Sequence, residues 1–217
     1  MKERPILLSG HMVRALLDGS KTQTRRVVKL PHNNPLGQWE PTTIGGENGG
    51  RTAACEALPL QGGIWHTRTG DSLVCPNGQP GDRLWVRETF AHMYRGNAAP
   101  ESRRDDDVVY KADGFTPDEY VYGSWKPSIH MPRWASRITL EVTGVRVERL
   151  QDISEQDAIA EGIGKTASGF WSTYGRSGVD GTYSPRSSFH CLWESINGPE
   201  AWDANPWVWV VEFKRVI

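Results

Sequence analysis

Residues 19–26 carry the side chains of this sequence best suited to acyl-transfer chemistry. They read GSKTQTRR, which places Lys21 three positions before Thr24. A threonine hydroxyl acts as a nucleophile when a neutral amine lies within hydrogen-bond reach, and burial or neighbouring cations favour the neutral form of a lysine. Because residues three apart point to opposite faces of a regular strand, this chemistry requires a turn or bulge between the two. The alternative is a solvated, charged turn.

Other motifs do not reach the spacing that their chemistry needs. Residues 162–166 read GIGKT, but a phosphate-binding loop requires glycine where Ile159 stands and a strand where a helix is expected. Cys55, His66 and Cys75 lack the paired spacing of zinc ligands. No serine lies in a G-x-S-x-G context. The sequence therefore predicts neither a metal site nor a cofactor.

Composition limits the partners that this chain can bind. The 217 residues include 25 Lys and Arg against 26 Asp and Glu, a net charge of −1. That balance argues against an electrostatic grip on long nucleic acid and is compatible with a small partner. Apolar runs are too short to span a membrane, no apolar leader is evident, and the three cysteines are widely spaced. We expect one cytoplasmic domain spanning residues 1–217, without membrane association, as a monomer or weak homodimer.

Local patterns predict the elements that must position these residues. Strands are expected at 5–8, 83–90, 108–112, 137–150 and 206–216, and helices after Ser9 and Ser154 and around Phe189. The alternation of 137–150 slips at Thr143–Gly144, which indicates a β-bulge. Ser154 and Asp157 resemble a capping box, and Gly162 is expected to end that helix.

Two stretches do not follow these patterns. Residues 31–80 and 162–187 are rich in Gly, Ser, Pro, Asn and Tyr, so both are interpreted as loop insertions. The remaining elements are five or six short strands and two or three short helices. This count predicts an α+β, mainly β fold, a small mixed β-barrel with a few short helices.

Several segments resemble the ASCH domain family. The resemblance lies in ILLS followed by LLDGSKTQTRR, in GDRLWV at 81–86, in residues 142–159 and in WVVEF at 209–213. It covers about half of the chain, and the whole sequence is similar to the long, Trp-rich ASCH proteins of phages and prophages. The resemblance implies a PUA-like barrel, a fold associated with RNA and modified nucleobases.

The resemblance also implies an activity. One bacterial branch of the family is an N4-acetylcytidine amidohydrolase, which removes the acyl group from the exocyclic amine of cytidine. The family's catalytic Lys, Thr and Glu correspond to Lys21, Thr24 and Glu161, and Arg26 matches an arginine of the same segment. In this scheme Thr24 attacks the acyl carbonyl after losing its proton to Lys21, and Glu161 protonates the leaving amine. A variant in which Lys21 and Thr24 activate water stays open.

A nucleobase also needs walls on which to stack. Three tryptophans beside polar residues are predicted to provide them, namely Trp85, Trp125 and Trp134. Glu88 is expected to accept a hydrogen bond from the cytosine amine or a ribose hydroxyl, or else to form an ion pair at the rim.

Two alternatives to the hydrolase remain. The first is a non-catalytic reader of RNA or modified bases, and the second is an ASCH ribonuclease. The expected partner of the hydrolase is one N4-acylated cytosine nucleoside, with RNA as a further possibility. Convergence of Lys21, Thr24 and Glu161 in one pocket would favour the enzyme, because a reader has no need for it.

Overall fold

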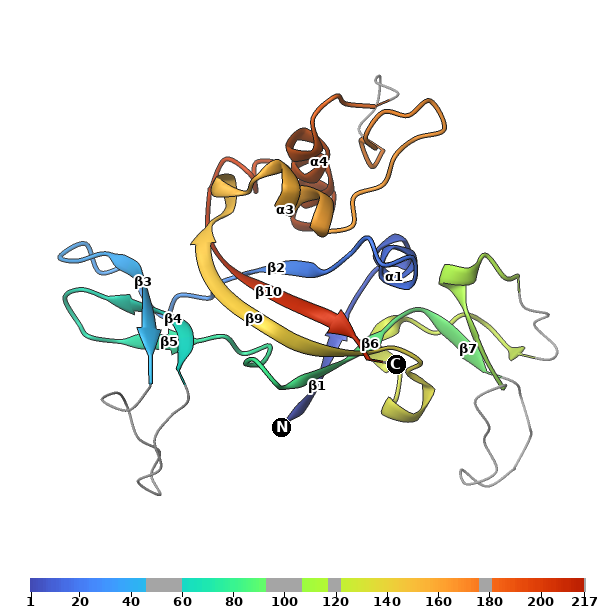
Figure 1. Cartoon of the computed structure of the whole chain (residues 1–217), viewed down its shortest axis with the longest axis horizontal. Coiled ribbons are helices and arrows are strands. Elements are labelled where there is room, and N and C mark those ends of the chain that lie inside the picture. Colours follow the sequence, from blue (N-terminus) through green and yellow to red (C-terminus); the bar gives the residue numbers. More distant parts are fainter. Residues whose placement is uncertain (46–59, 93–106, 117–121, 176–180, 217) are drawn as a thin grey trace.

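The computed structural model describes residues 1–45, 60–92, 107–116, 122–175 and 181–216, and Cys55 lies outside them. A curved five-stranded sheet forms the centre of the molecule (Figure 1). Its strand order is β1 (Glu3–Leu7), β6 (Arg83–Arg87), β9 (Thr139–Arg149), β10 (Trp207–Arg215) and β2 (Gln23–Val27). The β1–β6 pair is parallel and the other pairs are antiparallel. The sheet is therefore mixed, as predicted.

Smaller elements flank this sheet. A three-stranded antiparallel sheet contains β3 (Trp39–Ile44), β4 (Gln61–His66) and β5 (Ser72–Val74), and a separate pair contains β7 (Phe90–His92) and β8 (Val108–Tyr110). The α-helices of the described residues are α1 (Gly10–Leu17), α3 (Glu155–Ala160) and α4 (Pro185–Asn197). Short 3₁₀ turns lie at Lys111–Asp113, Ser128–His130, Arg133–Ala135 and Leu150–Asp152. None of the described helices is long and apolar enough to cross a membrane.

The predicted α+β, mainly β class is confirmed, but the main sheet does not close into a barrel. Within the described residues β1 and β2 are its two edges and do not pair with each other. A side chain bridges them instead: Arg26 Nη2, on β2, donates to the Leu7 carbonyl, on β1, at 3.0 Å. The chain between these strands forms α1, and a cavity lined by both strands lies at this gap.

Three local features predicted from the sequence are confirmed, and each depends on backbone geometry within a few residues. The slip at Thr143 is a β-bulge, because Glu212 faces Gly144 while Phe213 faces Val142. Ser154 Oγ accepts from the Asp157 amide at 3.0 Å and so caps α3. Gly162 follows α3 with a φ of 80°, as expected of a glycine that ends a helix.

The interpretation of residues 31–80 as a loop insertion is corrected by β3, β4 and β5. Glycines in β4 concealed the strand, because glycine is read as a loop residue. Here glycine is required by packing: a Cβ on Gly62 would lie 2.5 Å from the Val145 carbonyl oxygen of β9, and one on Gly63 would lie 2.4 Å from Ile44 Cδ1. The small sheet thus packs directly against the main one. Outside residues 176–180, which the structure does not describe, isolated bridges from Lys165 and Thr182 to Trp171 also show local order in the second predicted insertion.

A single large cluster of apolar side chains fills the space between the sheets and the helices. Trp209, only 2% exposed, belongs to it together with Val13, Leu84, Leu140 and Leu192. Trp207 is half-buried beside it, with the Arg149 guanidinium 4.2 Å from its ring. Burial of these side chains stabilises the frame that holds β2 in place.

Candidate functional site

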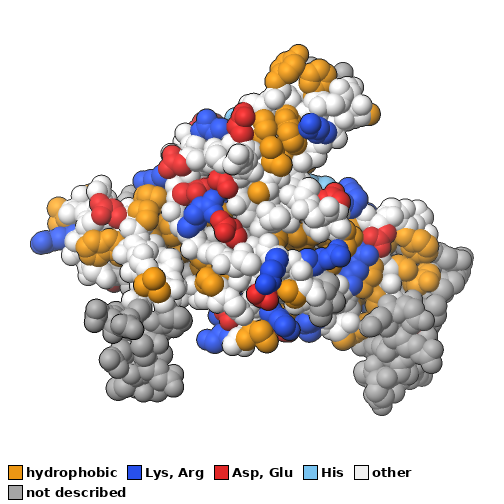
Figure 2. Space-filling model, in the orientation of Figure 1, with side chains coloured by type: hydrophobic (Ala, Val, Ile, Leu, Met, Phe, Trp, Pro, Cys, Tyr) orange, Lys and Arg blue, Asp and Glu red, His pale blue; other side chains and the backbone are white. Residues whose placement is uncertain are grey.

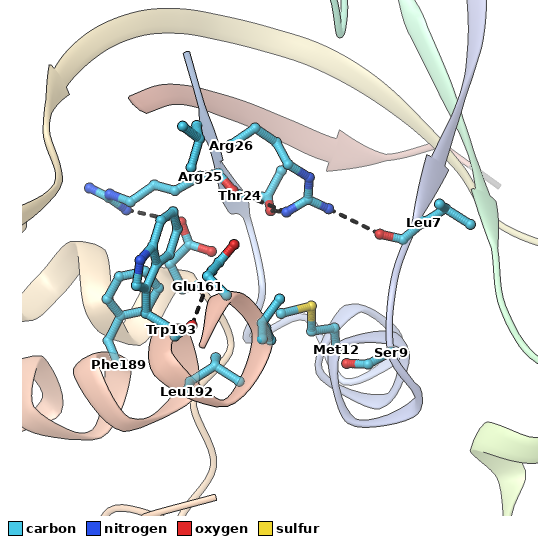
Figure 3. Close-up of a pocket in the computed structure, with 13 residues that line it drawn as sticks. Leu7, Ser9, Met12, Thr24, Arg25, Arg26, Glu161, Phe189, Leu192 and Trp193 are labelled. Carbon is cyan, nitrogen blue, oxygen red and sulfur yellow. Dashed lines mark hydrogen bonds and ion pairs between the residues drawn. The ribbon is translucent and has the colours of Figure 1, made fainter. Parts of the chain in front are cut away.

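A cavity of about 320 Å³ opens beside strand β2 (Figure 3). Thr24, Arg25, Arg26 and Val27 line it from β2, and Glu161 lines it from the end of α3. The opposite walls come from Leu7, Ser9 and Met12 at the start of α1 and from Phe189, Leu192, Trp193, Ile196 and Asn197 of α4. The charged side chains thus come from β2 and the end of α3, and the helical walls are mainly apolar apart from Ser9 and Asn197.

The chain turns at Lys21 before β2 begins, as the chemistry of this segment requires. The Lys21 amide donates to the Ala15 carbonyl of α1, and the Thr22 amide donates to the Ala160 carbonyl of α3, both at 2.9 Å. Lys21 and Glu161 therefore face each other as an isolated antiparallel bridge. The backbone thus holds two residues 140 positions apart side by side.

Gly162 makes this approach possible. Its φ of 80° lies in the left-handed region that disfavours residues with a Cβ. A Cβ at this position would also lie 2.7 Å from Ala15 Cβ and 2.8 Å from Lys21 Cβ. The helix end can meet Lys21 because residue 162 has no side chain.

The side chain of Lys21 is buried and fully hydrogen-bonded. Its ammonium donates to Glu161 Oε2 at 3.1 Å, to the Glu161 carbonyl at 2.7 Å and to the Gln23 carbonyl at 2.8 Å. Burial lowers the pKa of Lys21, and the Glu161 carboxylate opposes that effect. This geometry suits a protonated lysine, because three acceptors use all three N–H groups.

Glu161 is the residue that joins the site together. Its Oε2 binds Lys21, its Oε1 accepts from Arg25 Nη1 at 3.0 Å, and it also lines the cavity. The charge of this carboxylate is therefore balanced by two buried cations. A buried carboxylate needs such partners, because leaving it unpaired in a low-dielectric site is costly.

Thr24 is 1% exposed and lines the same cavity as Glu161. Its hydroxyl oxygen accepts from Arg26 Nη1 at 2.9 Å. Burial lowers the pKa of Arg26, whose other hydrogen bonds go to the carbonyls of Leu7 and Arg25. No carboxylate of the described residues forms an ion pair with Arg26, although Glu161 lies close enough to favour its charge.

The structure brings the three predicted catalytic residues together only through Glu161. Within the described part of the chain, no hydrogen bond links Lys21 Nζ with Thr24 Oγ1. Lys21 lies behind Glu161 and does not line the cavity, whereas Thr24 does. Direct proton transfer from Thr24 to Lys21 would thus require a movement of Lys21 Nζ or a bridging water.

The predicted nucleobase walls do not line this cavity. Trp85 lies on β6 with the Arg87 guanidinium 5.4 Å from its ring, and Trp134 is 39% exposed with its ring 6.4 Å from that of His92. Trp125 also lies outside it. The structure therefore does not bring these tryptophans to Thr24 and Glu161, because alternation within a strand or loop does not reveal which face a distant helix covers.

Glu88 is likewise absent from the cavity. It is buried and accepts from Arg137 Nε at 3.0 Å and Nη2 at 3.1 Å. Burial raises the pKa of Glu88, and Arg137 opposes this effect. The ion-pair interpretation of Glu88 thus fits the structure, and its expected contact with a substrate does not.

Two aromatic residues of α4 line the cavity and were missed. Phe189 and Trp193 lie four residues apart on one face of the helix, with their ring centroids 6.0 Å apart. The sequence showed their helical spacing, which is typical of a core-facing stripe. The apolar stripe continues to Ile196, and this continuation was the available signal in the sequence. In the structure Ile196 is 56% exposed, so the stripe extends beyond the core.

The described residues contain no cluster of three or more His, Cys, Asp or Glu side chains suited to a metal ion. His66 instead accepts from the Thr69 amide at 3.2 Å and lies near the Trp39 ring. Cys75 is buried and free, and burial raises the pKa of its thiol. These two residues serve the packing of the small sheet.

No family model matches the chain, and neither does any curated protein or solved structure. The resemblance to the ASCH family thus stays a prediction from the quoted motifs. Function is therefore inferred from the geometry of the cavity together with that resemblance.

Proposed function

We propose that this protein is an amidohydrolase that removes the acyl group from the exocyclic N4 of an acylated cytosine nucleoside, yielding cytidine and a carboxylate from N4-acetylcytidine. One observation supports it most: Glu161 contacts a buried lysine and lines a cavity together with Thr24. A simple binding site has no need for a buried lysine–carboxylate pair beside a hydroxyl. The proposal assigns the protein to the cytoplasm, with a single nucleoside as its partner.

The contact between Lys21 and Glu161 supplies the two protonation states that the reaction needs. Moving one proton along the 3.1 Å contact converts an ammonium and a carboxylate into a neutral amine and a carboxylic acid. Burial lowers the pKa of Lys21 and so favours its neutral amine. The amine is then a base, and the acid is a proton donor.

The reaction uses these groups in order. The Thr24 hydroxyl loses its proton to the amine of Lys21, through a bridging water or after a movement of Lys21 Nζ, and attacks the acyl carbonyl. The developing oxyanion receives hydrogen bonds from Arg26. Glu161 protonates the departing 4-amino group as the C–N bond breaks, which leaves the acyl group as an ester on Thr24. Water then hydrolyses that ester, releasing the carboxylate and restoring the hydroxyl. Activation of water by the same residues, without the ester, remains the variant.

The walls of the cavity suit a nucleobase. Phe189 and Trp193 of α4 add aromatic side chains to the lining of the cavity, beside Arg25 and Glu161 (Figure 3). Stacking of a base on such rings is worth about 1–3 kcal/mol. A volume of 320 Å³ lies at the small end of the range for ligand pockets. A single nucleoside matches this size better than a long polymer.

The decisive experiment incubates the purified protein with N4-acetylcytidine and follows the formation of cytidine by chromatography. Thr24→Val keeps the shape of the side chain and removes its hydroxyl, and we expect turnover to fall at least about 100-fold. Thr22→Val is the matched control, because Thr22 is exposed and lies outside the cavity. Equal turnover by both variants would exclude Thr24 as the nucleophile.

Lys21→Met and Glu161→Gln test the proton-transfer pair. Both variants should lose turnover, and circular dichroism must show that they remain folded, because each change leaves a buried charge without its partner. Absence of turnover by the wild-type protein with any N4-acyl substrate would reject the enzyme.

A reader of modified bases is the second candidate, and one observation favours it. The Lys21 ammonium already uses its three N–H groups, a resting state that needs no chemistry. Calorimetry with N4-acetylcytidine separates the two functions: binding without turnover indicates the reader, and binding with turnover indicates the hydrolase.

A further inference from the structure

Ser9 lies at the rim of the cavity and does not use its side chain as its position suggests. It is the N-cap residue of α1, with an extended backbone, and its side chain makes no capping hydrogen bond. Its Oγ lies 3.0 Å from His11 Nδ1 instead, and Ser9 lines the cavity. An N-cap serine normally accepts from an amide of the first turn. The Ser9 hydroxyl thus contacts His11 and not an amide of the helix, while Ser9 itself lines the cavity.

His11 holds this hydroxyl as an uncharged partner. Burial lowers the pKa of His11 to about 4, and the cations of Lys21 and Arg14 act in the same direction. Its ring lies 5.1 Å from that of Tyr174, and its Nε2 is buried without a hydrogen-bond partner among the described residues. At neutral pH one ring nitrogen is a donor and the other an acceptor.

The uncharged pair of Ser9 and His11 suits a ligand group that can both donate and accept a hydrogen bond. If His11 Nδ1 carries the proton, it donates to Ser9 and leaves the serine O–H free to donate. If Nε2 carries the proton, Ser9 donates to His11 and its oxygen remains an acceptor. A hydroxyl group satisfies either arrangement, whereas the pair brings no positive charge of its own for a phosphate or a carboxylate.

We propose that Ser9, oriented by His11, hydrogen-bonds a ribose hydroxyl of the substrate and makes the site select nucleosides over free bases. The inference rests on the proposed function, which places the N4-acyl group at Thr24 and Glu161. Ser9 lies at the other side of the cavity, on the first turn of α1, and it is exposed (Figure 3). The sugar is the end of a nucleoside remote from N4, so it would lie toward this rim.

The test compares kcat and KM for N4-acetylcytidine with those for N4-acetylcytosine, which has no sugar. Wild-type protein should prefer the nucleoside, and Ser9→Ala should reduce this preference about fivefold, mainly through KM, as expected for loss of one neutral hydrogen bond. Ser9→Thr, which keeps a hydroxyl, should retain it. Ser20→Ala is the matched control, because Ser20 flanks the other end of α1 and lies outside the cavity.

His11 is tested as a positioning residue. His11→Asn places an amide near the position of Nδ1 and should keep most of the preference for the nucleoside, whereas His11→Ala should lose it. A purely structural role for His11 would lower the turnover of both substrates equally and leave their ratio unchanged. An unchanged ratio in Ser9→Ala and His11→Ala overturns the proposal.

Binding measurements separate this inference from the proposed function. Calorimetry with cytidine and cytosine needs no turnover, and Ser9→Ala should weaken the binding of cytidine alone. If wild-type protein hydrolyses neither acylated substrate, the proposed function fails, and calorimetry still decides about Ser9. Equal affinity of the wild-type protein for cytidine and cytosine overturns the role of Ser9.

Discussion

Arg25 and Arg26 are neighbours on β2, yet they lie in opposite electrostatic surroundings. Arg25 is buried and contacts three carboxylates, those of Glu148, Asp157 and Glu161. Among the residues that the structure describes, Arg26 donates to Thr24 Oγ1 and to two backbone carbonyls. The difference shows that adjacent basic residues in a sequence can have different structural roles. The first arginine completes an ionic network, and the second lines the cavity without an ion pair to a described carboxylate.

The network around Arg25 extends across the outer part of the main sheet. Arg146 of β9 contacts Glu148, Asp157 and Glu212, so two arginines share two of these carboxylates. Figure 2 shows neighbouring blue and red side chains on this face of the molecule, over β9 and α3. Charges paired in this way hold α3, and with it Glu161, against β2. The ion pairs of Arg25 thus support the site, while Arg26 contacts the Thr24 hydroxyl that lines the cavity.

The largest effect is expected from breaking the network. Arg25→Met should lower the free energy of unfolding by about 3 kcal/mol, because it removes the buried cation that three carboxylates share and leaves Glu161 with Lys21 alone. Arg26→Met should lower it by about 1 kcal/mol, since only hydrogen bonds to uncharged acceptors are lost. Urea denaturation of both variants measures the difference. Equal losses would show that the two arginines have equivalent structural roles.

A smaller effect should separate the N-cap serines of the two short helices. Ser154 caps α3 through its side chain, and Ser9 does not cap α1. Ser154→Ala should therefore cost about 1 kcal/mol of stability, and Ser9→Ala should cost less than about 0.5 kcal/mol. Thermal unfolding measures both. A larger loss for Ser9→Ala would mean that its hydroxyl stabilises the fold and is not reserved for a ligand.

The smallest expected effect is a pH dependence of stability caused by His11, which lies on α1 beside Ser9. Its pKa is about 4 in the folded protein, against an ordinary value of 6.5 for histidine. Between pH 6.5 and 4 the unfolded chain binds a proton that the folded chain excludes, so this residue's contribution to stability falls as the pH falls. The melting temperature of the wild-type protein should therefore decrease more than that of His11→Asn between about pH 7.5 and 5. Parallel decreases would contradict a buried, neutral His11.

Sequence patterns predicted those parts of the fold that local rules control. The bulge at Thr143, the cap at Ser154 and the glycine stop at 162 each follow from backbone geometry within a few residues. The strands of the small sheet were missed because Gly62 and Gly63 serve packing against other strands. The prediction of a closed barrel was wrong, because no local sequence pattern encodes whether β1 and β2 pair.

The sequence by itself determined the α+β class, the order of the main elements and the segment that carries Lys21 and Thr24. Only the tertiary structure decided that Glu161 contacts Lys21, that Arg25 is neutralised while Arg26 is not, and that Phe189 and Trp193 replace Trp85 and Trp134 as cavity walls. The reason is physical. Hydrogen-bonding and hydrophobic periodicity act between close neighbours along the chain, whereas a cavity forms where distant elements meet.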